Sequence, residues 1–80
     1  MKISSAVAER MSVLLKEKGL SKHSVEKEMA IPHRTMQNII HAKREAGNLK
    51  TIFQICKGLG VSVSEFFNDP IFMGEELEID

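Results

Sequence analysis

The apolar residues of this chain recur at intervals of three and four within short segments, which capping residues, glycines and prolines separate. The first segment carries four of them, Val7, Met11, Leu14 and Leu15. At that spacing all four side chains lie on one face of a helix. Because Ser4 or Ser5 can cap its start and Gly19 supplies a stop, the pattern predicts a helix over residues 4–18.

The same pattern predicts four further helices, over residues 22–29, 33–41 and 63–68 and from Asn48 to Gly58 or Gly60. Three of them follow residues that can cap a helix: Ser21, Asn48 and Ser62, the last in a capping box with Glu65. Pro32 is tolerated at a helix start, and Pro70 follows where a helix could not continue. Five short helices without a strand pattern predict an all-α fold, a compact five-helix bundle.

Length and composition predict one soluble domain. A chain of 80 residues buries only about 60% of its unfolded surface, so the core must be small. The single cysteine, Cys56, excludes an intramolecular disulfide and a multi-cysteine zinc site, and it suits a reducing compartment. No apolar run approaches the ~18–20 residues of a membrane span, and the N-terminus lacks a signal-peptide layout. We therefore expect a cytoplasmic protein with no membrane partner.

The charges are segregated along the chain, although the net charge is zero. Residues 16–50 carry eight Lys/Arg against four acids, whereas residues 58–80 carry six acids and no Lys/Arg. This asymmetry favours an anion-facing side and an acidic tail, and a merely solvated surface is the alternative.

Three segments carry a likeness to a known family: residues 20–39, Lys43-Arg44, and residues 49–67 with Leu59-Gly60-Val61-Ser62 ahead of a short capped helix. Apolar residues also stand where that family buries them, at Leu20, Val25, Ile31, Met36 and Ile39. On these residues the chain resembles the Cro and phage-repressor helix-turn-helix family, also called the XRE family, from residue 3 to about 69. The resemblance implies a lambda-repressor-like DNA-binding domain over residues 1–69, and the charge distribution predicts a short acidic C-terminal tail over 70–80.

The chain departs from the family pattern at several positions. Glu26 stands where a small alanine usually faces the next helix, Lys22 where a glutamine commonly touches the DNA backbone, and Leu15 and Ile40 where the family often pairs an arginine with a glutamate. Ala30 stands where the tight turn usually has glycine, so its Cβ would strain the turn if that residue needs a positive φ.

The resemblance assigns base reading to the helix over 33–41, which would lie in the major groove. By this comparison the base-reading residues are His33, Arg34, Gln37 and Asn38. The apolar pattern selects the same face, because Met36, Ile39 and Ile40 fix the buried side. Arginine can chelate guanine, and glutamine or asparagine can pair with adenine. An ordinary solvated helix would more usually carry Glu/Lys pairs, and no acid occurs between Glu28 and Glu45.

Other polar residues flank this face and are candidates for phosphate contacts, which position a protein without reading sequence. They are Ser21, Lys22, Thr35, Lys43 and Arg44. The N-terminus of the helix over 22–29 also offers free backbone N–H groups to a phosphate.

Neither a metal site nor a catalytic site is expected. His23 and His33 lie on different helices, His33 and His41 are more than two turns apart, and no carboxylate partner or HxxxH spacing accompanies them. Nucleophile motifs and glycine-rich phosphate loops are missing from the sequence as well. We therefore expect no cofactor, no metal and no enzyme activity.

The sequence thus predicts a small, sequence-specific regulator of transcription, repressor-like, that binds double-stranded DNA. A homodimer is expected because one helix-turn-helix reads few base pairs, and because Phe66-Phe67 and the apolar residues of the tail offer hydrophobic surface. The alternative is an antitoxin or adaptor whose residues 71–80 bind a protein partner. From the residues alone, the tail either packs back on the domain or covers such a partner.

Overall fold

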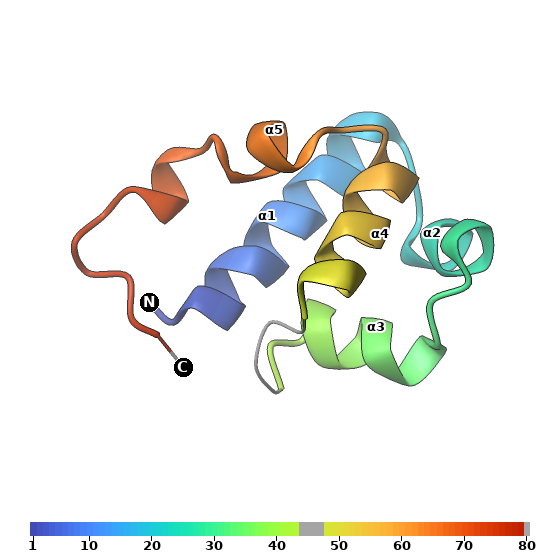
Figure 1. The fold of residues 1–80 in the computed structure, drawn as a ribbon, viewed down its shortest axis with the longest axis horizontal. Helices are drawn as coiled ribbons and strands as arrows, with labels where there is room; N and C mark the ends of the chain where they lie inside the picture. The colour runs from blue at the N-terminus through green and yellow to red at the C-terminus, as the bar shows by residue number, and fades with distance from the viewer. Residues whose placement is uncertain (44–47, 80) are drawn as a thin grey trace.

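The computed structural model describes residues 1–43 and 48–79. Within them the chain forms α1 (Ile3–Lys18), α2 (Lys22–Met29), α3 (His33–Ile40), α4 (Leu49–Leu59), α5 (Val63–Phe67) and the 3-10 helix η1 (Pro70–Phe72), as Figure 1 shows. The described residues form no strand beyond one isolated bridge between Lys2 and Glu78. The predicted all-α fold with five α-helices is therefore confirmed.

The caps of α2, α4 and α5 are the predicted ones. The side chains of Ser21, Asn48 and Ser62 accept hydrogen bonds from the backbone N–H of Ser24, Thr51 and Glu65, respectively. Gly60, with φ of 75°, ends α4, whereas Gly58 lies inside that helix. The two predicted ends of α4 are thereby distinguished, because only Gly60 adopts the left-handed conformation that favours glycine.

The start of α1 differs from the prediction. Ser4 and Ser5 lie inside the helix, which begins at Ile3, and the residue at the N-cap, Lys2, makes no side-chain cap. Instead, the backbone N–H of Ile3 donates to the carbonyl oxygen of Glu78 at 2.8 Å. The tail therefore satisfies one of the first N–H groups of α1, which have no partner inside the helix. The predicted helices over 33–41 and 63–68 are each one residue shorter, ending at Ile40 and Phe67.

The core lies between α1 and the other helices. Its most deeply buried side chains are Phe66, Met11, Met36, Ile55, Val7, Val25 and Cys56. α1 packs against α3 and η1, while α2 packs against α4 and α3. This arrangement places α2 and α3 at one side of the molecule and the tail at the other side of α1 (Figure 1).

The turn between α2 and α3 passes through Ala30, whose φ and ψ are 54° and 41°. Ala30 therefore has the positive φ at which its Cβ strains the turn. A Cβ in the left-handed region costs about 1–2 kcal/mol. The turn is closed by Ile31, which is 5% exposed and whose N–H donates to the carbonyl of Glu26 at 2.9 Å. Burial of Ile31 offsets the strain at Ala30.

The tail folds back along α1, which is the first of the two arrangements that the sequence left open. Phe72 of η1 packs against Phe66 and Phe67, with ring centroids 6.2 Å and 4.8 Å apart. Arg10 of α1 donates to the carbonyls of Glu65 and Phe66 at 2.9 Å and 2.8 Å. The same guanidinium pairs with Asp69 at 3.3 Å. These contacts hold α5 and η1 against α1.

One premise of the dimer prediction is wrong. Phe66 is 0% exposed and Phe67 is half-buried against the core, so this pair offers little free apolar surface. The structure buries it because η1 brings Phe72 onto both rings. The division of the chain at residue 69 stays a prediction.

Candidate nucleic-acid interface

α3 presents a polar face opposite a buried one. Met36 and Ile39 are 1% and 3% exposed and turn toward the core. On the other face, His33 and Arg34 are exposed, while Gln37 and Asn38 are half-buried. The separation of apolar and polar residues at helical spacing accounts for this orientation. All four residues that the sequence analysis named therefore lie on the outer side of α3.

Arg34 is the freest of these four side chains. It is exposed, and its guanidinium makes no hydrogen bond or ion pair with residues 1–43 or 48–79. The side chain of Asn38 likewise has no polar partner in that part of the chain. Both therefore keep their full set of donors, and Asn38 its acceptor, for a ligand.

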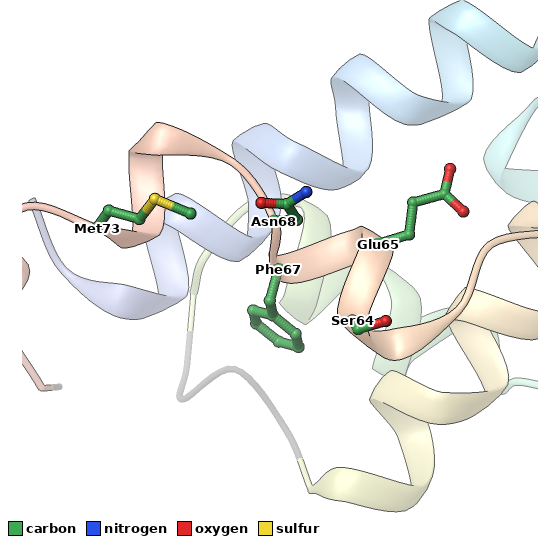
Figure 2. Close-up of a pocket in the computed structure, with 5 residues that line it drawn as sticks. All are labelled: Ser64, Glu65, Phe67, Asn68 and Met73. Carbon is green, nitrogen blue, oxygen red and sulfur yellow. The ribbon is translucent and has the colours of Figure 1, made fainter.

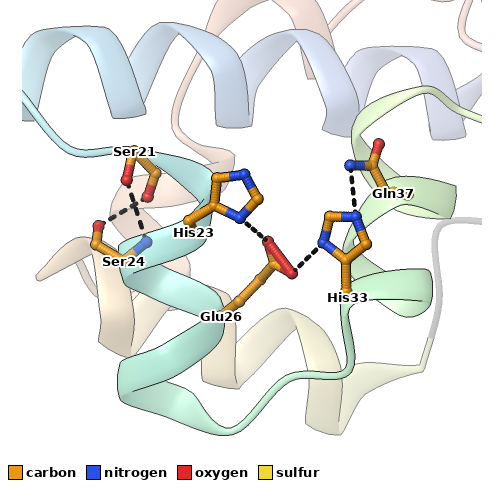
Figure 3. Close-up of polar contacts among 6 residues, drawn as sticks. All are labelled: Ser21, His23, Ser24, Glu26, His33 and Gln37. Carbon is orange, nitrogen blue, oxygen red and sulfur yellow. Dashed lines mark hydrogen bonds and ion pairs between the residues drawn. The ribbon is translucent and has the colours of Figure 1, made fainter.

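His33 and Gln37 are engaged with other side chains. Nδ1 of His33 lies 2.7 Å from Oε1 of Glu26, and its Nε2 lies 3.2 Å from Nε2 of Gln37, as Figure 3 shows. On the other side of Glu26, Nδ1 of His23 lies 3.4 Å from Oε2. One carboxylate on α2 thus lies between two histidines, one from each helix.

This cluster corrects the sequence analysis on two points. His23 and His33 do lie on different helices, but their rings stack with centroids 5.5 Å apart. A carboxylate partner is also present, because Glu26 is i+3 from His23 and faces α3. The signal in the sequence was the acid at residue 26 where the family usually has alanine; only the packing of α2 on α3 shows which side chains it meets.

The proposed phosphate contacts fall into two groups. Ser21 is exposed, but its hydroxyl oxygen accepts from the N–H of Ser24 at 3.1 Å, so it serves as a helix cap. Lys43 is exposed, Lys22 and Thr35 are half-buried, and neither lysine pairs with an acid within the described ranges. Arg44 lies outside the described residues. Lys22 begins α2 and Lys43 follows α3, so both lysines can meet an anion at the ends of this helix pair.

A surface hollow lies between α5 and η1, and no residue of α2 or α3 lines it. Its lining residues are Ser64, Glu65, Phe67, Asn68 and Met73, as Figure 2 shows. Glu65 is the one charged side chain among these lining residues, and its carboxylate would repel a phosphate. The hollow is therefore not part of an anion-binding surface.

Two short helices joined by a tight turn, the second with a polar outer face, define the class of helix-turn-helix DNA-binding proteins. A family model described as the Cro/C1-type HTH DNA-binding domain matches residues 10–70, and the chain belongs to this family. Comparison with curated proteins finds no match, and comparison with solved structures finds none.

Membership in this family makes the chain a DNA-binding protein of the kind that acts in transcription regulation. The family's fold is a DNA-binding regulatory one and is not typically enzymatic. No helix within residues 1–43 and 48–79 is long and apolar enough to cross a membrane.

Proposed function

We propose that this chain is a sequence-specific, repressor-like regulator that places α3 in the major groove of double-stranded DNA. The observation that carries the proposal is the outer face of α3. Arg34 and Asn38 project there without partners in the described chain, and no acid interrupts this face of the helix. Free donors beside a groove edge are what base reading requires.

Arg34 and Asn38 are the principal base-reading residues in this proposal. A guanidinium can donate two hydrogen bonds to O6 and N7 of guanine, and a side-chain amide can pair with N6 and N7 of adenine. Gln37 and His33 already contact each other, so fewer of their donors and acceptors are free for bases unless that contact breaks. They therefore contribute less to discrimination than Arg34.

The phosphate contacts come from both ends of the recognition unit. Lys22 and Ser21 stand at the N-terminus of α2, where backbone N–H groups also point outward. Lys43 follows α3, and its N–H is fixed by the carbonyl of Asn38 at 3.0 Å. Thr35 and Arg44 complete the proposed set. These contacts fix the register of α3 without reading sequence.

The proposal includes a cytoplasmic homodimer. Two copies would read paired half-sites about one helical turn, ~34–36 Å, apart. With Phe66 buried, the apolar surface for self-association is offered by α4 instead: Leu49 and Phe53 are 76% and 49% exposed and lie one turn apart. Sedimentation at micromolar concentration should therefore show a dimer. Phe53→Ser should weaken this dimer. A wild-type monomer that binds DNA without cooperativity would contradict the proposed homodimer.

Selection of bound sequences from a random duplex pool tests the function. The chain should enrich one motif, and it should bind the selected duplex more tightly than a scrambled one, with affinity falling as salt rises. If no sequence is enriched but both duplexes bind at low salt, the protein binds DNA without reading it. If neither duplex binds at low salt, the proposal is wrong.

A further inference from the structure

The corner between α2 and α3 gathers three side chains whose atoms commonly bind metal ions. They are His23 and Glu26, one turn apart on α2, and His33, the first residue of α3. One ligand atom from each lies within 4.8 Å of the other two. Figure 3 shows both imidazoles directed at the carboxylate between them. The packing of α2 against α3 therefore brings two imidazole nitrogens and one carboxylate within 4.8 Å of one another.

The carboxylate in this cluster is incompletely satisfied. The side chain of Glu26 is 9% exposed, and its Oε2 is buried without a hydrogen bond from the described residues. The contact of Oε2 with His23 is an ion-pair distance of 3.4 Å rather than a hydrogen bond. A buried charge requires a close partner, because it has lost its hydration. The two imidazoles remain 71% and 59% exposed, so an ion can reach Glu26 from solvent.

We propose that His23, Glu26 and His33 bind a divalent transition-metal ion of the zinc class. Two histidines and one carboxylate form a known zinc ligand set, in which water fills the fourth tetrahedral position. Bonds of about 2.0–2.1 Å in that geometry place the ligand atoms roughly 3.3 Å apart. Oε1 of Glu26 lies 2.7 Å from Nδ1 of His33 and Oε2 lies 3.4 Å from Nδ1 of His23, so each imidazole faces its own oxygen of the carboxylate. Small rotations of exposed rings complete the site.

Gln37 is placed to orient one of the ligands. A histidine that binds through Nδ1 must carry its proton on Nε2, and that N–H needs an acceptor. The side-chain amide of Gln37 lies 3.2 Å from Nε2 of His33. With its amide turned so that Oε1 faces the ring, Gln37 accepts this hydrogen bond.

A bound ion would connect α2 to α3 across the strained turn at Ala30. It would also replace the charge of Glu26 by a net positive charge at the start of α3. This inference rests on the proposed function in one respect: a bound ion would link metal binding to DNA binding, because His33 belongs to the proposed base-reading set. The metal site itself does not depend on that function.

Cobalt binding to the full chain tests the site directly, because tetrahedral Co²⁺ absorbs visible light and Zn²⁺ should displace it. The wild type should bind one equivalent. His23→Ala and Glu26→Gln should each weaken binding at least about tenfold, since loss of an outer-sphere partner alone costs 10–100-fold. His41→Ala is the matched control, because His41 is an exposed histidine outside the cluster. It should bind Co²⁺ as the wild type does.

A second measurement uses thermal unfolding. Zn²⁺ should raise the unfolding midpoint of the wild type and of His41→Ala, because an ion that binds only the folded chain stabilises it. The midpoint of His23→Ala should not change. Circular dichroism confirms that the variants fold. Absence of the cobalt absorption in the wild type, or equal affinity in the wild type and His23→Ala, would overturn the proposal and leave the cluster as an ion-pair network. Since neither readout contains DNA, a failure of DNA binding is distinguishable from a failure of the metal site.

Discussion

Gly58 of α4 lies so close to Val25 of α2 that a Cβ atom on Gly58 would stand 2.7 Å from Cγ1 of Val25. Met29, one turn further along α2, would be 3.0 Å away. Val25 is 1% exposed and has a stiff, branched side chain, so it cannot swing aside. The missing side chain at residue 58 therefore lets the first helix of the helix-turn-helix unit sit directly on α4.

Gly58→Ala should lower the free energy of unfolding by up to about 2 kcal/mol. Overpacking a core costs about 1–3 kcal/mol, and it outweighs the helix propensity gained, about 1 kcal/mol at most. Chemical denaturation measures the change. In a Val25→Ala background the same substitution should cost less, because the clash is relieved. An equal cost in both backgrounds would contradict the contact.

Ala30→Gly should stabilise the protein by about 0.5–1 kcal/mol. Glycine relieves the left-handed strain at Ala30, and the greater freedom of the unfolded chain offsets part of that gain. Ala8→Gly is the matched control, because Ala8 lies inside α1, where glycine is expected to destabilise by about 1 kcal/mol or more. Thermal unfolding of both variants should show midpoints that move in opposite directions. A fall in both midpoints would be inconsistent with strain at this turn.

Arg34→Ala should lose about 1–3 kcal/mol of affinity on the selected duplex and much less on a scrambled one. Lys43→Ala should instead weaken both duplexes similarly and lower the salt slope by about 1. Affinity-versus-salt titrations separate the two behaviours. Lys2→Ala, at the start of α1 beside the tail, controls for the loss of any positive charge. If Arg34→Ala leaves discrimination unchanged, α3 does not read the groove through this residue.

Melting curves accompany those titrations. Arg34 and Lys43 are exposed and pair with none of the described side chains, so their substitution should change stability by less than about 0.5 kcal/mol. A loss of binding without a loss of stability then reports on the DNA contact alone.

The acidic tail should lie away from DNA, because carboxylates beside phosphates would oppose binding. Glu75→Gln with Glu76→Gln tests this without disturbing the packing of Phe72, which truncation after Asp69 would remove. Both glutamates are exposed, so the double variant should keep its stability. DNA affinity should stay the same or rise slightly. A loss of more than about threefold at unchanged stability would place these side chains in the DNA interface.

Cys56 makes stability depend on pH in the alkaline range. Burial raises the pKa of its thiol above the value of about 8.5 in an unfolded chain. Above that pH the unfolded chain loses the proton while the folded chain retains it, so ionisation favours unfolding. The free energy of unfolding should fall by at most about 1.4 kcal/mol per pH unit from this cause. In Cys56→Ala, denaturation curves from neutral to alkaline pH should show a shallower decline, whereas an identical decline would exclude the thiol as its source.

The sequence predicted the helices and the caps of α2, α4 and α5 because these depend on residues within one turn of each other. Ser21, Asn48 and Ser62 each bond to a backbone N–H three residues on, and the buried face of α3 follows from its apolar spacing. The candidate base-reading face was predictable for the same reason. Its composition alone, however, did not show that His33 and Gln37 are already engaged.

The tertiary structure decided the contacts between residues that are distant along the chain. Whether Glu78 would reach the N–H of Ile3, whether Arg10 would hold Asp69, and whether His33 would meet Glu26 all depend on how the helices pack. Periodicity fixes which face of a helix is buried, but it carries no information on which other helix covers that face. The sequence therefore determined the elements and the side that α3 exposes, while packing alone brought His33 of α3 to His23 and Glu26 of α2.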